Sequence, residues 1–260
     1  MKKILSAIMI TSILFSSCKK ESTEIFQDTP GKVDVKFDAV FGNQDFALNT
    51  DLTTGTKTFK FNKFRYWVSN VVLVKTNGEE YNVPKSYYLL EETSAVAVQD
   101  GDYTYPANKR ELVELSNIPA GEYKAIKFGI GVESKYNDNL SLQIGELSQL
   151  NGMTNVSWMW HTSYIFTAIG GTANENAIAK TIKIETGLNT NYRTVTLNFP
   201  QNLSIGSTKS TAIDIKADVA KVLDGIDVMA TPIVGAAQAS TMTALANNYA
   251  TKVFSVSLVK

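Results

Sequence analysis

The sequence predicts an all-β domain, folded as an antiparallel β-sandwich with one or two short helices near the C-terminus. Short stretches in which apolar and polar residues alternate recur along the chain, as in half-buried strands. Turn-forming residues separate these stretches at short intervals. Helical spacing of apolar residues is confined to the C-terminal part, so helices are a minor component.

The N-terminal segment precedes this domain. Two lysines at the start, an apolar stretch over residues 4–15 and small residues before position 18 predict a secretory signal peptide over residues 1–17. The apolar stretch is shorter than the roughly 20 residues that span a bilayer. We therefore expect the segment to be cleaved rather than retained as an anchor.

Cys18 directly follows the expected cleavage site, an arrangement typical of bacterial lipoproteins whose first mature residue is lipidated. Residues 18–32 then form the lipidated cysteine and a polar tether, and residues 33–260 form a single domain. We expect a lipoprotein of the bacterial cell envelope that faces the periplasm or the surface. Lys19, in place of an aspartate, favours the outer membrane.

Composition excludes several classes of function. Cys18 is the single cysteine, so the domain has no disulfide, zinc–thiolate site or nucleophilic thiol. The 260 residues contain 25 basic and 25 acidic side chains. Because no basic surplus is present, we do not expect nucleic acid as a partner.

The N-terminal half of the domain is expected to consist of strands and turns. The stretch 59–74 is aromatic and β-branched throughout and predicts a long strand. Asn77-Gly78 predicts a tight turn, and residues 93–109 predict a loop or small excursion. Further strands are expected at residues 33–37, 46–48, 81–83, 87–90 and 110–115.

A second strongly β stretch covers residues 122–132 and contains Gly129 and Gly131. No helix follows these glycines, which argues against a nucleotide-binding loop. They instead predict a close backbone approach or a bulge. The polar stretch 136–152 is expected to be a loop, with one or two helical turns at residues 142–150.

The C-terminal half is expected to begin with a core strand at residues 158–169 that ends at Gly170-Gly171. A short helix at residues 215–223 should stop at Gly225, and a second helix is expected at residues 234–248. Strands are expected at residues 179–184, 193–199, 210–215 and 253–258.

Residues 151–169 gather Trp158, Met159, Trp160 and the only histidine, His161. In an extended chain Met159 and His161 point to the same face. A thioether beside an imidazole suits Cu(I) better than calcium or magnesium. The simpler interpretation, in which these residues fill a core and His161 forms a hydrogen bond, is the more common fate of each residue type.

Five motifs in order resemble the MbnP-like family. They are Phe64-Arg-Tyr-Trp-Val-Ser-Asn-Val, Asn117-Ile-Pro-Ala-Gly-Glu-Tyr, Phe128-Gly-Ile-Gly-Val, Asn151-Gly-Met with Trp158-x-Trp160, and Tyr164-Ile-Phe166. The resemblance implies an exported, copper-associated β-rich protein. It also implies that a di-haem peroxidase-like partner oxidises a tryptophan, here Trp158 or Trp160, to kynurenine, which joins histidines around a copper ion. The candidate ligands in this chain are then His161, Met159 and the oxidised tryptophan.

The sequence departs from the family pattern at two places. Residues 154–157 lengthen the usual compact Gly-Met-aromatic-Trp run, and Glu185 stands where many relatives have a histidine. With His161 alone, a two-histidine copper site cannot be built within one chain.

Two other functions stay open. In a non-catalytic surface module that has lost the copper site, Tyr66, Trp67, Tyr103 and Tyr105 would stack on a glycan or bind a protein, although aromatic residues on strands are more often core. In a hydrolase, His161 would be the general base, but the sequence does not show a nucleophile and an acid beside it. We expect a binding protein and not an enzyme.

Overall fold

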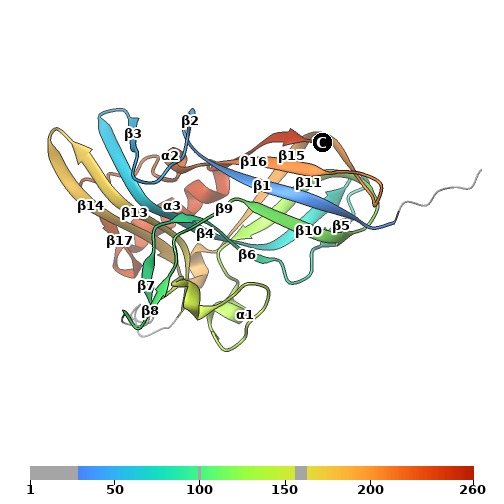
Figure 1. Cartoon of the computed structure of the whole chain (residues 1–260), viewed down its shortest axis with the longest axis horizontal. Helices are drawn as coiled ribbons and strands as arrows, with labels where there is room; N and C mark the ends of the chain where they lie inside the picture. The colour runs from blue at the N-terminus through green and yellow to red at the C-terminus, as the bar shows by residue number, and fades with distance from the viewer. Residues whose placement is uncertain (1–28, 99–100, 156–162) are drawn as a thin grey trace, which may run out of the picture.

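A computed structural model describes residues 29–98, 101–155 and 163–260 (Figure 1). The expected signal peptide, Cys18 and most of the tether lie outside these residues. No helix in the described part of the chain is long and apolar enough to cross a bilayer.

The described residues are mainly β-strands. In chain order the strands are β1 (Gly31–Phe41), β2 (Gln44–Asp45), β3 (Asp51–Thr54), β4 (Lys57–Lys75), β5 (Glu80–Asn82), β6 (Tyr87–Thr93), β7 (Val96–Val98), β8 (Tyr103–Tyr105), β9 (Asn108–Arg110), β10 (Leu112–Ile118), β11 (Gly121–Ile130), β12 (Thr154–Asn155), β13 (Ser163–Glu175), β14 (Ile178–Gly187), β15 (Arg193–Ile205), β16 (Ala212–Asp218), β17 (Ile233–Val234) and β18 (Phe254–Val259). The helices are α1 (Ser134–Asn137), α2 (Val219–Val222) and α3 (Ala239–Thr251), with 3₁₀ turns η2 (Gln149–Asn151), η3 (Asn189–Asn191) and η4 (Ala236–Gln238).

Two sheets pack face to face and confirm the predicted all-β sandwich. One has the strand order β10-β1-β16-β18, and the other has β15-β11-β4-β13-β14-β17. Aromatic side chains join them: the ring of Phe37 on β1 contacts that of Phe128 on β11 at 5.4 Å, and Phe254 on β18 contacts Tyr66 on β4 at 5.7 Å.

Pairing is antiparallel in all but two of the described ladders. The parallel pairs are β1 with β16 and β14 with β17, which the antiparallel prediction did not include. β1 lies between β10 and β16, and β16 follows it by more than 170 residues. Whether two strands so far apart in sequence pair in parallel or antiparallel depends on the path of the chain between them. The alternation of apolar and polar residues within each strand contains no information about that path.

The long strand β4 is covered on both faces in its central part. Phe64 and Tyr66 face the other sheet, so Arg65 and Trp67 point to the opposite side. That side is covered by the segment 134–155, where the ring of Tyr136 contacts Tyr87 on the neighbouring strand β6 at 5.3 Å. Every residue from position 64 to 69 is therefore buried.

Gly170-Gly171 does not end β13, contrary to the prediction. The strand continues to Glu175, and the register with β4 shifts between the two glycines. Gly171 has a φ of +147°, and a Cβ atom there would lie 2.2 Å from the carbonyl oxygen of Lys60. The glycines thus mark a bulge where the backbone of β4 comes close.

The predicted loop at residues 93–109 contains more structure than expected. It holds the hairpin β7–β8 and the short strand β9, which pairs with β6. Within residues 142–150, the predicted helical turns reduce to the start of η2. The close approach or bulge predicted near Gly129 is confirmed: the register with β4 shifts between Lys127 and Gly129, and a Cβ atom at Gly129 would meet the hydroxyl of Tyr192 at 1.9 Å.

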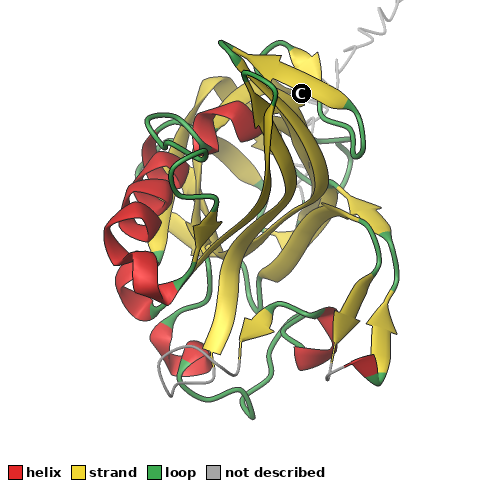
Figure 2. Cartoon of the chain, turned by 90° about the vertical axis from the view of Figure 1, so that its left-hand side faces the viewer, coloured by secondary structure: helices red, strands yellow, loops and turns green. Residues whose placement is uncertain are grey.

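Both predicted C-terminal helices are present. The first is limited to α2, since the preceding residues belong to β16, while α3 ends three residues later than predicted. Figure 2 shows α3 along one side of the strands. Its buried Met242, Leu245 and Tyr249 close that side of the sandwich, and the ring of Tyr249 contacts Tyr66 at 6.3 Å.

Candidate functional site

All four predicted metal ligands, Trp158, Met159, Trp160 and His161, lie outside the described residues. The residues on either side are described: β12 pairs with the start of β13, so Thr154 is opposite Tyr164 and Asn155 is opposite Ser163. Buried Met153 accepts a backbone hydrogen bond from Ile165 at 2.9 Å. Asn155 and Ser163, the described residues on either side of positions 156–162, are therefore neighbours at the start of β13.

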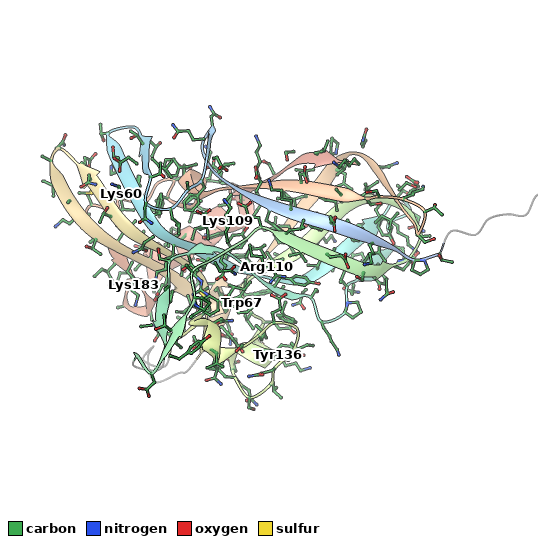
Figure 3. All side chains as sticks on the ribbon, viewed as in Figure 1. Lys60, Trp67, Lys109, Arg110, Tyr136 and Lys183 are labelled. Carbon is green, nitrogen blue, oxygen red and sulfur yellow. The ribbon has the colours of Figure 1, made fainter. Side chains whose placement is uncertain are left out.

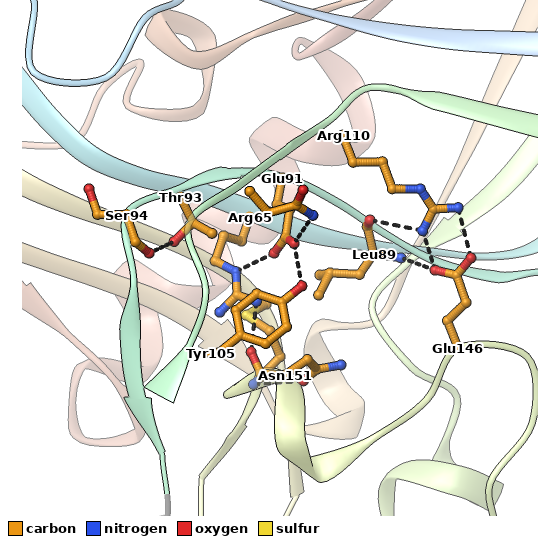
Figure 4. Close-up of polar contacts among 11 residues, drawn as sticks. Arg65, Leu89, Glu91, Thr93, Ser94, Tyr105, Arg110, Glu146 and Asn151 are labelled. Atoms are coloured by element: carbon orange, nitrogen blue, oxygen red, sulfur yellow. Dashed lines mark hydrogen bonds and ion pairs between the residues drawn. The ribbon is translucent and has the colours of Figure 1, made fainter. Parts of the chain in front are cut away.

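A buried ion pair lies on the same side of the sheet. Arg65 on β4 and Glu91 on β6 are ladder partners, and Arg65 Nε donates to Glu91 Oε2 at 2.7 Å (Figure 4). Both side chains are 1% exposed. Such a pair costs desolvation free energy and is retained only where further hydrogen bonds satisfy both groups.

Those further hydrogen bonds come from the excursion between β6 and β10. The Tyr105 hydroxyl donates to Glu91 Oε1 at 2.5 Å, and Asn108 Nδ2 donates to the same oxygen at 2.7 Å. The Arg65 guanidinium lies over the Tyr105 ring at 4.9 Å. Burial, followed by the bond to the Glu91 carboxylate, raises the pKa of Tyr105 to about 12, so the hydroxyl is a proton donor at neutral pH.

The same arginine holds the chain that leads into β12. Arg65 Nη2 donates to the backbone carbonyl of Asn151 at 2.7 Å, and Asn151 Oδ1 accepts from the backbone N–H of Met153 at 3.0 Å. Gly152 has a φ of +71°, a backbone conformation that favours glycine. The Asn151-Gly152-Met153 motif is therefore a turn tied to the central strand of the sheet.

A pocket of about 230 Å³ opens beside this cluster. Glu91 and Tyr105 form one part of its wall, and Arg110 on β9 and Glu146 form another. Arg110 binds Glu146 through two hydrogen bonds, one of which spans 2.7 Å, and Glu146 also accepts the backbone N–H of Leu89 at 3.1 Å. Figure 4 shows Leu89 between the Arg65–Glu91 pair and the Arg110–Glu146 pair.

The aromatic residues considered for glycan stacking divide into two sets. Tyr66 is 2% exposed and Trp67 is fully buried, so both are core residues, as is more common for aromatic residues on strands. Figure 3 shows Trp67 within the interior of the molecule. Tyr103 and Tyr105 instead line the pocket.

Glu185 lies on the same face as the ion pair. It is opposite Ala168 on β13, and Ala168 is in turn opposite Arg65, so one row crosses the sheet. Lys183 Nζ lies 3.6 Å from the carboxylate. Burial raises the pKa of Glu185, while the positive charges of Lys183 and Lys63 lower it by less.

Glu185 should make the stability of the fold depend on pH. A carboxyl group whose folded pKa is raised contributes most at low pH, and this contribution is lost as the pH rises through its folded pKa. We expect Glu185→Gln to remove that loss, so that its stability relative to the unsubstituted chain increases between pH 4 and 7. Urea unfolding of both proteins across this range measures the difference.

The control is Glu114→Gln, since the Glu114 carboxylate is solvent-exposed and its pKa is lowered by hydrogen bonds from Lys32 and Ser116. The stability of Glu114→Gln relative to the unsubstituted chain should decrease as the pH rises, opposite to the increase expected for Glu185→Gln. Parallel stability profiles for Glu185→Gln and the unsubstituted chain would contradict the burial argument.

The described residues do not complete a metal site by themselves. Among them, no three His, Cys, Asp or Glu side chains are grouped so as to hold a metal ion. Three buried polar groups near the start of β13 also have no hydrogen-bond partner within the described chain: Trp67 Nε1, Ser163 Oγ and Tyr164 Oη. Buried donors of this kind normally have a partner, so the polar requirements of this region are not met by the described residues alone.

No function was assigned to Arg65 or Glu91 from the sequence, although their positions in the sequence could have indicated a buried ion pair. Arg65 interrupts the aromatic run Phe64-Arg-Tyr-Trp67, and Glu91 comes directly after the aromatic and apolar run Tyr87-Tyr-Leu-Leu90 and before Glu92. Two opposite charges in such segments indicate a buried pair, because a charge is rarely buried without a partner.

The fold and this cluster define a class of protein: a β-sandwich domain with a supported turn at the start of one central strand and a polar pocket beside it. The MbnP family model matches residues 30–243, and the chain belongs to this family. The solved structure of MbnP from Methylosinus trichosporium shares the fold, with a TM-score of 0.50 and 16% sequence identity over 75% of this chain and 78% of that one. A comparison with curated proteins gave no match.

Proposed function

We propose that this protein is a lipid-anchored envelope protein whose MbnP domain binds copper. His161 and Met159 are the proposed ligands, and Trp158 or Trp160 becomes a third after oxidation by a di-haem peroxidase-like partner. Membership of the MbnP family over residues 30–243 is the observation that carries the proposal. The protein handles copper and does not catalyse a reaction of its own.

The geometry around residues 156–162 supports this assignment. The residues before and after this segment pair with each other in the β12–β13 ladder. The chain before it is also held by the hydrogen bond from Arg65 to the carbonyl of Asn151. Ligands on a short segment with fixed ends lose less conformational entropy on binding than ligands on a free loop. The described fold thus provides rigid support for a site whose ligands lie in this segment.

The chemistry of the donor set also favours copper in its reduced state. A thioether and an imidazole are ligands that Cu(I) accepts, whereas a carboxylate is a harder donor. Glu185 therefore does not replace a histidine for Cu(I), although it stands where many relatives have one. Bound copper would serve storage or transfer of the ion, and the residues named here would hold it.

We expect His161→Ala to weaken Cu(I) binding by more than about 100-fold, because the loss of outer-shell partners alone typically costs 10–100-fold in metal affinity. Calorimetry with Cu(I) on the full mature chain measures the affinity. Met159→Leu should weaken binding as well, since leucine keeps the volume of methionine but lacks its sulfur. Met229→Leu, a change distant in sequence at a half-buried position, is the matched control and should bind as the unsubstituted chain does.

Mass spectrometry of protein purified from its native envelope tests the remaining parts. The expected result is a lipidated Cys18 and a peptide containing Trp158 and Trp160 with the mass of one kynurenine. Absence of Cu(I) binding both before and after treatment with a di-haem partner would exclude the copper function. An unmodified Cys18 would exclude the lipid anchor without affecting the copper proposal.

A further inference from the structure

The pocket beside Arg65 and Glu91 has features of a ligand site that is separate from copper handling. Its wall comes from three parts of the chain: the β6–β9 pair, strand β8, and the segment 146–151. Its volume of about 230 Å³ is small for a ligand pocket, which suits an occupant of about one six-membered ring with substituents. Tyr103 and Leu150, at 39% and 48% exposure, leave this pocket open to solvent.

The charges in the wall are already paired. Glu91 accepts from Arg65, Tyr105 and Asn108, and Arg110 binds Glu146 through two hydrogen bonds. A charged ligand that displaced Arg65 from Glu91 would leave a charge uncompensated at 1% exposure, which is costly. The wall therefore favours a ligand without net charge.

Several polar groups in the wall retain hydrogen-bonding capacity. Within the described chain, the Asn108 side-chain carbonyl has no donor, because the amide nitrogen makes the bond to Glu91. The Asn151 side-chain oxygen accepts from the backbone N–H of Met153 and the Ser148 oxygen from that of Leu150. The Asn151 amide nitrogen and the Ser148 hydroxyl hydrogen donate to no acceptor among the described residues. The Asn151 side chain is buried, at 7% exposure. These groups offer both donors and an acceptor to a neutral polar ligand.

The remaining wall is apolar. Tyr103, Leu89 and Leu150 line the pocket, and the Tyr103 ring has no aromatic or cationic partner within the described residues. Figure 4 shows Tyr105 and Asn151 on one side of Leu89 and Arg110 with Glu146 on the other. An apolar ring surface next to fixed amides and hydroxyls matches a molecule with one C–H face and a rim of hydroxyl groups.

We propose that this pocket binds a neutral monosaccharide unit, either free or at the end of a glycan, through Tyr103, Asn108, Ser148 and Asn151. The proposal does not depend on copper, because none of these residues is a proposed metal ligand. It also differs from stacking on Tyr66 and Trp67, which the core excludes.

Saturation-transfer difference NMR on the full mature chain tests the proposal. The probes are glucose, galactose, mannose and N-acetylglucosamine, with glucuronate and glucosamine as charged counterparts. We expect at least one neutral sugar to bind in the millimolar range and the charged counterparts to bind more weakly. Tyr103→Ala should weaken binding by roughly three- to tenfold, the range expected for one aromatic contact.

Leu258→Ala is the matched control, because Leu258 is 43% exposed on β18 in the other sheet. It should leave sugar binding unchanged, and both variants should unfold at the same temperature as the unsubstituted chain. No transfer to any neutral sugar would overturn the proposal. So would equal binding of neutral and charged sugars, or equal effects of the two substitutions.

Discussion

Replacing Glu91 with alanine is expected to lower the free energy of unfolding by about 3–5 kcal/mol, the cost of leaving one partner of a buried ion pair without the other. Arg65 would keep its charge at 1% exposure, with only the Asn151 carbonyl as a remaining hydrogen-bond acceptor among its described contacts. Tyr105 and Asn108 would lose their shared acceptor at the same time. Urea unfolding of the mature chain measures the change.

The double substitution Arg65→Met with Glu91→Leu is the informative comparison. Because both charges are removed together, it should recover part of the stability that Glu91→Ala loses. It should also release the Asn151 turn, since no side chain would then hold that carbonyl. A loss below about 1 kcal/mol for Glu91→Ala would resemble an exposed ion pair and would contradict the burial of this cluster.

Gly171→Ala is expected to destabilise the fold by about 2–5 kcal/mol, combining backbone strain with overpacking. The added Cβ atom would meet the backbone of the neighbouring strand at Lys60 and Phe61, within 2.2 and 2.7 Å. Backbone atoms in a ladder cannot move aside as the end of a side chain can. Thermal and urea unfolding of the purified variant would show the loss.

Gly55→Ala provides the control for backbone conformation. Gly55 also has a positive φ, +57°, but a Cβ atom there would meet no atom within 4 Å. Its cost should be limited to about 1–2 kcal/mol from the left-handed conformation alone. Equal losses for the two variants would show that the close approach of β4 contributes nothing.

The strands were predictable where alternation reports one buried face. The stretches that became β1 and β15 follow this rule. The β4 and β11 segments were predictable from their apolar, aromatic and β-branched composition instead. Alternation alone did not show that β4 is buried on both faces. That feature depends on the segment 134–155, whose polar sequence resembles an exposed loop.

The remaining errors came from contacts between residues far apart in the chain. Gly170-Gly171 suggested an end to the strand because glycine is common in turns, yet it permits the approach of Lys60, over 100 residues earlier. The β1–β16 pairing likewise joins residues that local patterns cannot relate. Of the candidate site, the sequence indicated only the candidate ligands in residues 156–162, whereas the hydrogen bond from Arg65 and the pocket became visible only in the fold.

The central place of β1 has a mechanical consequence. Its hydrogen bonds to β10 on one side and β16 on the other run across the strand direction over most of its length. A force applied to the chain before Gly31 and resisted at Phe254, where β18 begins at the opposite end of the sheet, would load these bonds in shear, so many must break together. Rupture under such a load is governed by the unfolding rate and not by equilibrium stability. The domain should therefore withstand pulling from its N-terminal side better than an arrangement in which the first strand lies at a sheet edge and unzips bond by bond.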